Sequence, residues 1–340
     1  MKKIFSVLFV VFQFSFFAFS HDFHLSVEPL VGLKNGQVDE YVFLKKCDYS
    51  DDKLSELNWD VKNEFYLGGK IETGYKKLFA DFKFTAAIPK SSGQMDDSDW
   101  LNVEKSGTEA YQYKTNYSIS DNFLKYDFLF GVDLGYDFDI FKNEILKIRL
   151  RPLIAFNYEK FYFNARNGSA WYGSYSGNHY LPYESATTPT YSFSGKSVID
   201  YIRQSYTPWF GMNSYFTFKD KIDVGLGFRI SPYTYVESID IHYLNNGEDG
   251  SAYLDATPGY FKTIKCSAEA SYRINSRNSI NFSANWVCMN ILRGDDYEQT
   301  YKSYKKTKKF DPAKTKNSTV DGGAAEHYFD FSLSYKFKIF

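Results

Sequence analysis

Apolar and polar residues alternate along several segments of this chain, and this alternation restricts its fold more than any other feature. Between residues 146 and 156 the even-numbered positions are apolar or proline, and the odd-numbered positions include Lys147 and Arg149. The segments 78–88 and 222–230 repeat the pattern. Because successive side chains of a β-strand point to opposite faces, each segment is predicted to form a wall with lipid on one side and water on the other.

The connections between such segments alternate in length, which indicates the number of strands. Four short connections, expected at 76–77, 141–143, 219–221 and 275–278, alternate with five long ones, expected at 46–53, 98–110, 167–196, 244–256 and 293–320. Outer-membrane barrels combine short periplasmic turns with long outer loops. Several strands would span about 20 residues, or roughly 65 Å at ~3.3 Å per residue, which is about twice what a membrane needs. The sequence therefore predicts an all-β fold, a ten-stranded antiparallel transmembrane β-barrel that extends beyond the outer membrane.

The first 20 residues have the composition of a secretory signal peptide. Lys2 and Lys3 form a short basic segment, an apolar stretch follows at 4–19, and Ala18 and Ser20 are the small residues that precede a cleavage site. We therefore expect residues 1–20 to be a cleaved signal peptide and residues 21–340 to form the barrel. A protein of this kind is expected in the outer membrane of a Gram-negative-type (diderm) bacterium.

The composition agrees with a barrel and argues against several other classes of protein. Phe and Tyr contribute 33 and 30 residues to an aromatic content of 20%, and aromatic side chains favour strands and membrane interfaces. The 40 basic and 41 acidic residues balance, which argues against a nucleic-acid partner. The three cysteines are an odd number, so at least one is unpaired, and whether Cys266 and Cys288 form a disulfide is left open.

Two short motifs place ionisable side chains on one face of a strand. Asp97 and Asp99 lie two residues apart, as do Asp240 and His242, and residues two apart on a strand point the same way. Each motif falls where a predicted strand, the third or the seventh of ten, enters a long outer loop, so the two would face each other across the outer mouth. The second motif occupies even-numbered positions, whereas the polar residues earlier in the same strand occupy odd-numbered positions. A bulge is therefore expected, with Pro232 as its position.

Motifs of other hydrolases and of metal or phosphate sites are missing from the sequence. It contains no nucleophile elbow, zinc-protease motif or phosphate-binding loop. His21 and His24 lie next to the expected cleavage site and are interpreted as part of an N-terminal tail, not as metal ligands. We therefore expect no metal site and no cofactor.

Around these motifs the sequence resembles the omptins, a family of outer-membrane proteases built on a ten-stranded barrel. The stretches that carry the resemblance, in the family's order, are 54–59 (LSELNW), 94–100 (QMDDSDW), 161–166 (FYFNAR) and 236–243 (VESIDIHY). The resemblance implies that Asp97, Asp99, Asp240 and His242 are catalytic. In the family, an aspartate pair on one wall and an Asp–His pair on the other hold the attacking water.

These residue types suit hydrolysis by a free water molecule. Histidine has a pKa near neutrality and can act as the general base. Asp240 would orient it, and Asp97 would hold the water with support from Asp99. No covalent intermediate is implied, because no serine or cysteine accompanies the set. The resemblance thus implies an aspartyl endopeptidase that cleaves polypeptide substrates at the cell surface, with its active site facing outside.

Two departures from the family limit what the resemblance implies. Omptins use two acidic residues to bind an arginine or lysine before the scissile bond. Glu40 matches the first of them as a substrate-binding residue, but Ser238 stands in place of the second, so we predict a less strict preference for basic residues. The family's lipopolysaccharide-binding cluster corresponds to Phe156, Tyr158 and Lys160, of which Lys160 alone keeps its character. Contact with outer-membrane lipid is expected, and a dependence on lipopolysaccharide is left open.

Two other functions remain compatible with the sequence. The long aromatic outer loops suit a non-enzymatic barrel that acts as an adhesin or surface receptor. A porin is disfavoured, because ten strands leave little open lumen.

Overall fold

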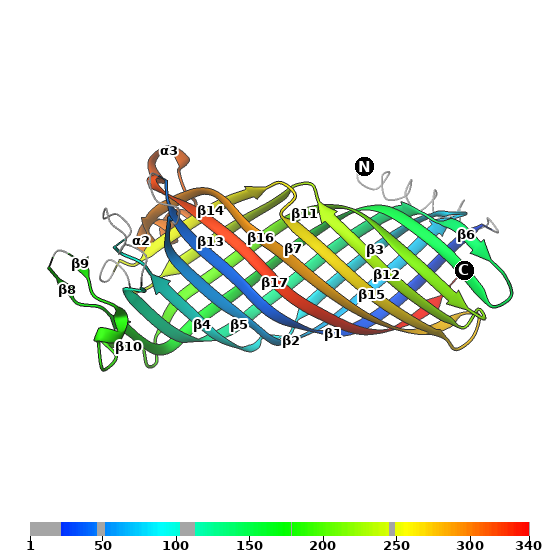
Figure 1. Cartoon of the computed structure of the whole chain (residues 1–340), viewed down its shortest axis with the longest axis horizontal. Coiled ribbons are helices and arrows are strands. Elements are labelled where there is room, and N and C mark those ends of the chain that lie inside the picture. The colour runs from blue at the N-terminus through cyan, green and yellow to red at the C-terminus, as the bar shows by residue number, and fades with distance from the viewer. Residues whose placement is uncertain (1–21, 46–51, 103–112, 178, 245–248, 340) are drawn as a thin grey trace, which may run out of the picture.

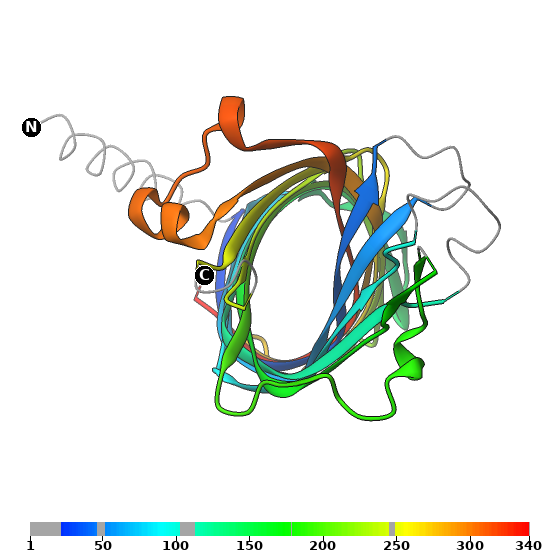
Figure 2. The same cartoon turned by 90° about the vertical axis from the view of Figure 1, so that its left-hand side faces the viewer.

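The computed structural model describes residues 22–45, 52–102, 113–177, 179–244 and 249–339. In this part of the chain each strand pairs antiparallel with its neighbours and the last pairs with the first, so that ten strands form a closed ring (Figure 1, Figure 2). The predicted all-β, ten-stranded barrel is confirmed.

Three of the ten strands are interrupted and carry two labels each. In chain order the barrel strands are β1 (Phe23–Leu44), β2 (Lys53–Tyr75), β3 with β4 (Leu78–Ala87, Lys90–Asp99), β5 (Asn116–Tyr136), β7 (Leu146–Tyr172), β11 (Ser197–Phe218), β12 with β13 (Ile222–Ser231, Thr234–His242), β14 with β15 (Ser251–Gly259, Thr263–Arg273), β16 (Asn278–Thr300) and β17 (Lys316–Lys338). The smaller elements are β6 (Phe138–Lys142), β8 (Tyr175–Ser176), β9 (His179–Tyr180), the 3-10 helix η1 (Tyr183–Ser185), β10 (Tyr191–Ser192), α2 (Tyr301–Thr307) and α3 (Pro312–Thr315).

The connections lie at the two ends of the barrel as the sequence predicts. Figure 1 shows α2, α3, β8 and β9 with the long connections at one end, and short turns at the other. Three loops are shorter than expected, because β7 continues to Tyr172, β14 begins at Ser251 and β16 continues to Thr300, opposite Ser251. Strands that project into water need no lipid-facing alternation, so the sequence pattern ends before the backbone pairing does.

A belt of exposed apolar side chains surrounds the half of the barrel nearest the short turns. These side chains are more than a third exposed and lie on the outer face of the ring; examples are Leu78, Phe82, Phe84, Leu134, Ile154, Phe210, Leu226, Phe228, Phe282, Phe331 and Leu333. Such a belt is what spans the membrane in outer-membrane barrels. No helix in the described ranges is long and apolar enough to span a membrane.

The strand interruptions lie at the outer edge of this belt. They occur at 88–89, 232–233 and 260–262. The interruption at 232–233 changes the parity of its strand, because Arg229 faces the interior below it and Asp240 faces the interior above it. The irregularity expected at Pro232 is therefore present.

The interior between the outer end and the belt is filled by side chains that reach across the ring. Trp59 of β2 is fully buried and stacks on Phe163 of β7 and Tyr201 of β11, with ring centroids 5.9 and 5.3 Å apart. Nearer the belt, Lys34 of β1 lies 2.6 Å from Glu159 of β7 and also bonds to Asp127 of β5 and ion-pairs with Glu64 of β2. These contacts tie non-adjacent strands together.

Two further expectations concern the signal peptide and the cysteines. The predicted signal peptide lies outside the described residues, so cleavage after residue 20 stays a prediction. Cys266 and Cys288 lie on the neighbouring strands β15 and β16, and both are free thiols.

Candidate active site

Asp97 and Asp99 lie on the inner face of β4, near its outer end. The register places Asp97 opposite Leu57 and Asp99 opposite Ser55, both on β2. Asn116 Nδ2 donates a hydrogen bond of 3.1 Å to Asp99 Oδ2, and Ser55 also bonds to this carboxylate. Within the described ranges no side chain hydrogen-bonds to Asp97, which leaves its carboxyl group available to a ligand.

Asp240 and His242 lie on the inner face of β13, also at the outer end. His242 Nε2 bonds to Asp240 Oδ2, so the carboxylate fixes the orientation of the ring. The Tyr253 ring of β14 packs against the imidazole edge to face, with centroids 5.4 Å apart. The side chains of Asp240 and His242 are 5% and 18% exposed. The histidine is therefore held in place yet reachable from solvent.

The two pairs are close enough across the barrel interior to change each other's protonation. Burial raises the pKa of Asp97 to about 8, and the negative charge of Asp99 adds to this effect while His242 opposes it. Burial alone would lower the pKa of His242, but Asp240, Asp97 and Asp99 together raise it to about 9. Burial likewise raises the pKa of Asp99. The arrangement thus contains an acid–base set whose charges depend on one another.

Glu40 joins this set from the neighbouring wall. It lies on β1, opposite Leu57 of β2 and Ala324 of β17, and is 3% exposed. Burial and the surrounding carboxylates, Asp240 first among them, raise the pKa of Glu40 well above its usual value. The five residues proposed from the sequence, Asp97, Asp99, Asp240, His242 and Glu40, therefore come together at the outer end of the barrel.

Two further carboxylates belong to this region and were missed by sequence reasoning. Asp255 of β14 is the register partner of Ser238 on one side and of Asp296 of β16 on the other. The sequence analysis assigned both residues to long loops. In a loop, an odd or even position does not indicate the direction of a side chain. The alternation of buried Asp255 and Thr257 is the signal that, with the strand recognised, would have pointed Asp255 inward.

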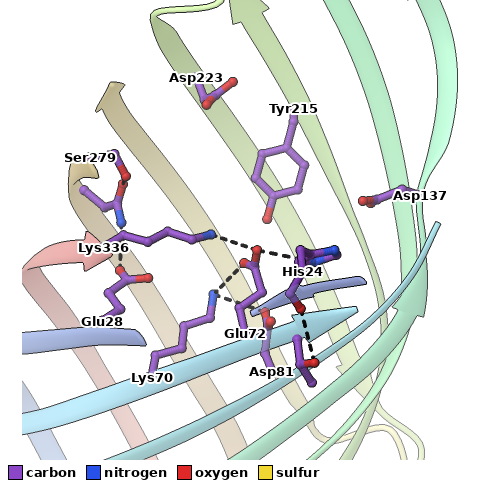
Figure 3. Close-up of polar contacts among 12 residues, drawn as sticks. His24, Glu28, Lys70, Glu72, Asp81, Asp137, Tyr215, Asp223, Ser279 and Lys336 are labelled. Atoms are coloured by element: carbon purple, nitrogen blue, oxygen red, sulfur yellow. Dashed lines mark hydrogen bonds and ion pairs between the residues drawn. The ribbon is translucent and has the colours of Figure 1, made fainter. Parts of the chain in front are cut away.

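The inner end of the barrel holds a different polar region, and His24 belongs to it. A cavity of about 1000 Å³ is lined there by residues of both charges. His24 lies in β1, with its ring 4.0 Å from Glu72, and Figure 3 shows the two side chains facing each other. The interpretation of His24 as a free tail is therefore wrong, because the strand begins at Phe23 and carries His24 into the lumen. No group of three His, Cys, Asp or Glu within the described ranges is arranged to hold a metal ion.

Comparisons with known proteins agree with this architecture. The family model described as Omptin family matches residues 21–329. The plasminogen activator of Yersinia pestis is 25% identical over 232 residues, which cover 65% of this chain and 67% of that protein. The crystal structure of the outer membrane protease OmpT from Escherichia coli superposes with a TM-score of 0.73 at 17% identity, covering 93% of this chain and 97% of that one. The chain therefore belongs to the omptin family of outer-membrane proteases.

Proposed function

We propose that this outer-membrane protease cleaves polypeptides at the cell surface with a water molecule held between Asp97 and His242. The observation that supports the proposal is that the Asp97–Asp99 and Asp240–His242 pairs, from opposite walls, lie near enough for the charges of each pair to shift pKa values in the other. A water molecule bound between them would contact an acceptor on each side. Their outward position suits substrates that approach from outside the cell.

Each residue has a distinct part in the proposed reaction. Neutral His242 accepts a proton from the water through Nδ1, because Nε2 is bonded to Asp240. The water oxygen bonds to the carbonyl carbon of the substrate. When the carbon–nitrogen bond breaks, the same proton passes to the leaving amine. Asp240 stabilises the imidazolium that forms in between, and Asp97, with Asp99 behind it, orients the water.

Substitution of His242 tests this mechanism. His242→Ala should lower kcat/KM for peptide cleavage by about 10²–10⁴-fold, the range typical of a lost general base. The matched control is His327→Ala, whose side chain is exposed on β17. Both variants should keep the heat-modifiable electrophoretic migration of a folded barrel. Cleavage at the wild-type rate by folded His242→Ala would refute the proposed base.

We also propose that the apolar belt contacts outer-membrane lipid. Trp286 of β16 lies opposite Phe329 of β17, whose side chain is 54% exposed. Lipids with brominated acyl chains should therefore quench part of the tryptophan fluorescence, and Trp286→Phe should remove much of that part. Equal quenching in both proteins would argue against lipid contact at this face.

A further inference from the structure

A lysine without a partner lies in the cavity at the inner end of the barrel. Lys265 of β15 lines this cavity and is half-buried. Within the described ranges, no carboxylate forms an ion pair with Lys265 and no acceptor hydrogen-bonds to its Nζ. The other lysines and arginines of the cavity are ion-paired or lie exposed near the short turns. Lys336, for example, lies 2.8 Å from Glu72, and Figure 3 shows it pointing toward that carboxylate.

The strongest charges around Lys265 do not compensate it. Arg229 of β12 is its register partner, so two cations face the lumen side by side on neighbouring strands. Like charges at such positions are destabilising. Arg229 and Lys83 act most strongly on Lys265, and the carboxylates of Asp330 and Asp133 follow. Three cations and two carboxylates therefore meet here, which is an excess of one positive charge.

Both of these carboxylates are already bonded to other residues across the lumen. Asp133 of β5 accepts hydrogen bonds of 2.9 and 2.6 Å from the guanidinium group of Arg229. Asp330 of β17 accepts a hydrogen bond from the Tyr66 hydroxyl group of β2. Neither carboxylate is within ion-pair distance of Lys265, so the excess charge is left without a counterion from the described part of the chain.

Donors from three strands lack acceptors in this region. Lys83 Nζ of β3 lies 3.8 Å from Asp330 Oδ2, which is beyond hydrogen-bond distance, and has no other acceptor among the described residues. Arg229 Nε is buried and likewise has no partner there. Together with the Lys265 ammonium group, these donors belong to β3, β12 and β15. Buried donors are nearly always bonded in folded proteins, so an acceptor is missing here.

The shape of the cavity determines the side from which a ligand can reach these donors. Its lining extends from the short turns, at Lys221 and Asn275, to Lys83 and Tyr328. Farther toward the outer end, Lys34 and the three carboxylates around it cross the lumen. A ligand would therefore enter from the periplasm. The volume of about 1000 Å³ suits a small solute.

We propose that Lys265, together with Lys83 and Arg229, binds the phosphate group of a small periplasmic solute. The excess positive charge requires an anion. The oxygens of a phosphate group point in several directions and can accept from three strands at once, whereas the two oxygens of a carboxylate share one plane. The site lies at the opposite end of the barrel from the proposed catalytic residues, so it does not depend on the proposed function.

The test is calorimetric titration of the refolded barrel in detergent with inorganic phosphate, at an ionic strength held constant with sodium chloride. Wild type should bind phosphate saturably. Lys265→Gln should raise the Kd about tenfold or more, because a charge-assisted hydrogen bond and the excess charge are lost together. Lys62→Gln is the matched control and should leave the Kd unchanged, since Lys62 of β2 is exposed and has no ion pair among the described residues.

A change in the opposite direction makes the test specific to this site. Asp330→Asn removes a carboxylate that competes for the same cations, so phosphate should bind several-fold more tightly. Unchanged or weaker binding to Asp330→Asn would show that the anion does not lie among these residues. Lys83→Gln should weaken binding, and it replaces Lys265→Gln if that variant loses the heat-modifiable migration of a folded barrel.

A second ligand distinguishes the two sources of a phosphate group. Glycerol 3-phosphate that binds more tightly than inorganic phosphate would indicate a phosphate monoester, and the reverse order would indicate the free ion. Either order supports the site, provided that Lys265→Gln weakens the binding of both. The absence of saturable binding to wild type, or equal Kd values in wild type and the lysine variants, would overturn the proposal.

Discussion

The protonation of His242 gives a quantitative prediction about the pH dependence of cleavage. Its pKa is raised from 6.5 to about 9 although burial acts in the opposite direction. At about 1.4 kcal/mol per pKa unit, its surroundings favour the imidazolium by roughly 3 kcal/mol. A base must be neutral to accept a proton, so cleavage should rise as pH increases toward this raised pKa.

Asp240→Asn removes the neighbour that raises the pKa most. Burial would remain and would favour the neutral ring, with only Asp97 and Asp99 opposing it. The pKa of His242 should therefore fall by at least about one unit, or roughly 1.4 kcal/mol. The maximal rate should fall as well, because the imidazolium formed during reaction would lose its partner.

The assay is kcat/KM for a fluorogenic peptide between about pH 5 and pH 10. The acidic limb of the profile should lie above pH 6.5 in wild type and move to lower pH in Asp240→Asn. Asp121→Asn serves as a control, because that carboxylate is not among the groups that shift His242. An acidic limb that stays in place in Asp240→Asn would refute the assignment of His242 as the titrating base.

Three further predictions concern stability. Trp59→Ala should destabilise the barrel by about 3–5 kcal/mol, measured by urea unfolding in detergent, because a fully buried ring is lost from the interior. Lys34→Met should cost a similar amount, roughly 3–5 kcal/mol, by leaving the three carboxylates around it without a cation, and should be less harmful at acid pH. Burial raises the pKa of Asp255 well above 3.8, so the folded state favours the protonated form of this carboxyl group. The stability of the fold therefore falls as pH rises from about 3.8 through the raised pKa. Asp255→Asn should accordingly resist urea better than wild type near neutral pH, and this difference should vanish at a pH below about 3.8.

The sequence predicted the barrel because one physical constraint, lipid on one face and water on the other, leaves a periodic pattern. The same parity argument indicated the irregularity at Pro232 and the inward direction of Asp97 and Asp240. The alternation of apolar and polar residues ends where the strands leave the membrane. Asp255 was missed there, because strand pairing in water requires no alternation and a polar strand resembles a loop.

Contacts across the lumen lay beyond sequence reasoning for a different reason. Lys34 bonds to residues 93 and 125 positions away in sequence. Nothing in a local pattern indicates which inward charge of one strand meets which charge of another. The register and the twist of the closed ring determine these pairs, and both follow from the whole set of strands.

The filled interior has a consequence for the permeability of the cell envelope. Trp59, Phe163 and Tyr201 stack between the outer end and the membrane, and the charges around Lys34 lie beneath them. Within the described residues, these contacts cross the lumen and narrow it along the axis. In the proposed mechanism, fragments are released at the outer end and are expected to diffuse back into the medium. We therefore expect a cell with many copies of this barrel to lose fewer solutes and admit fewer toxic molecules than a cell with an equal number of open porins.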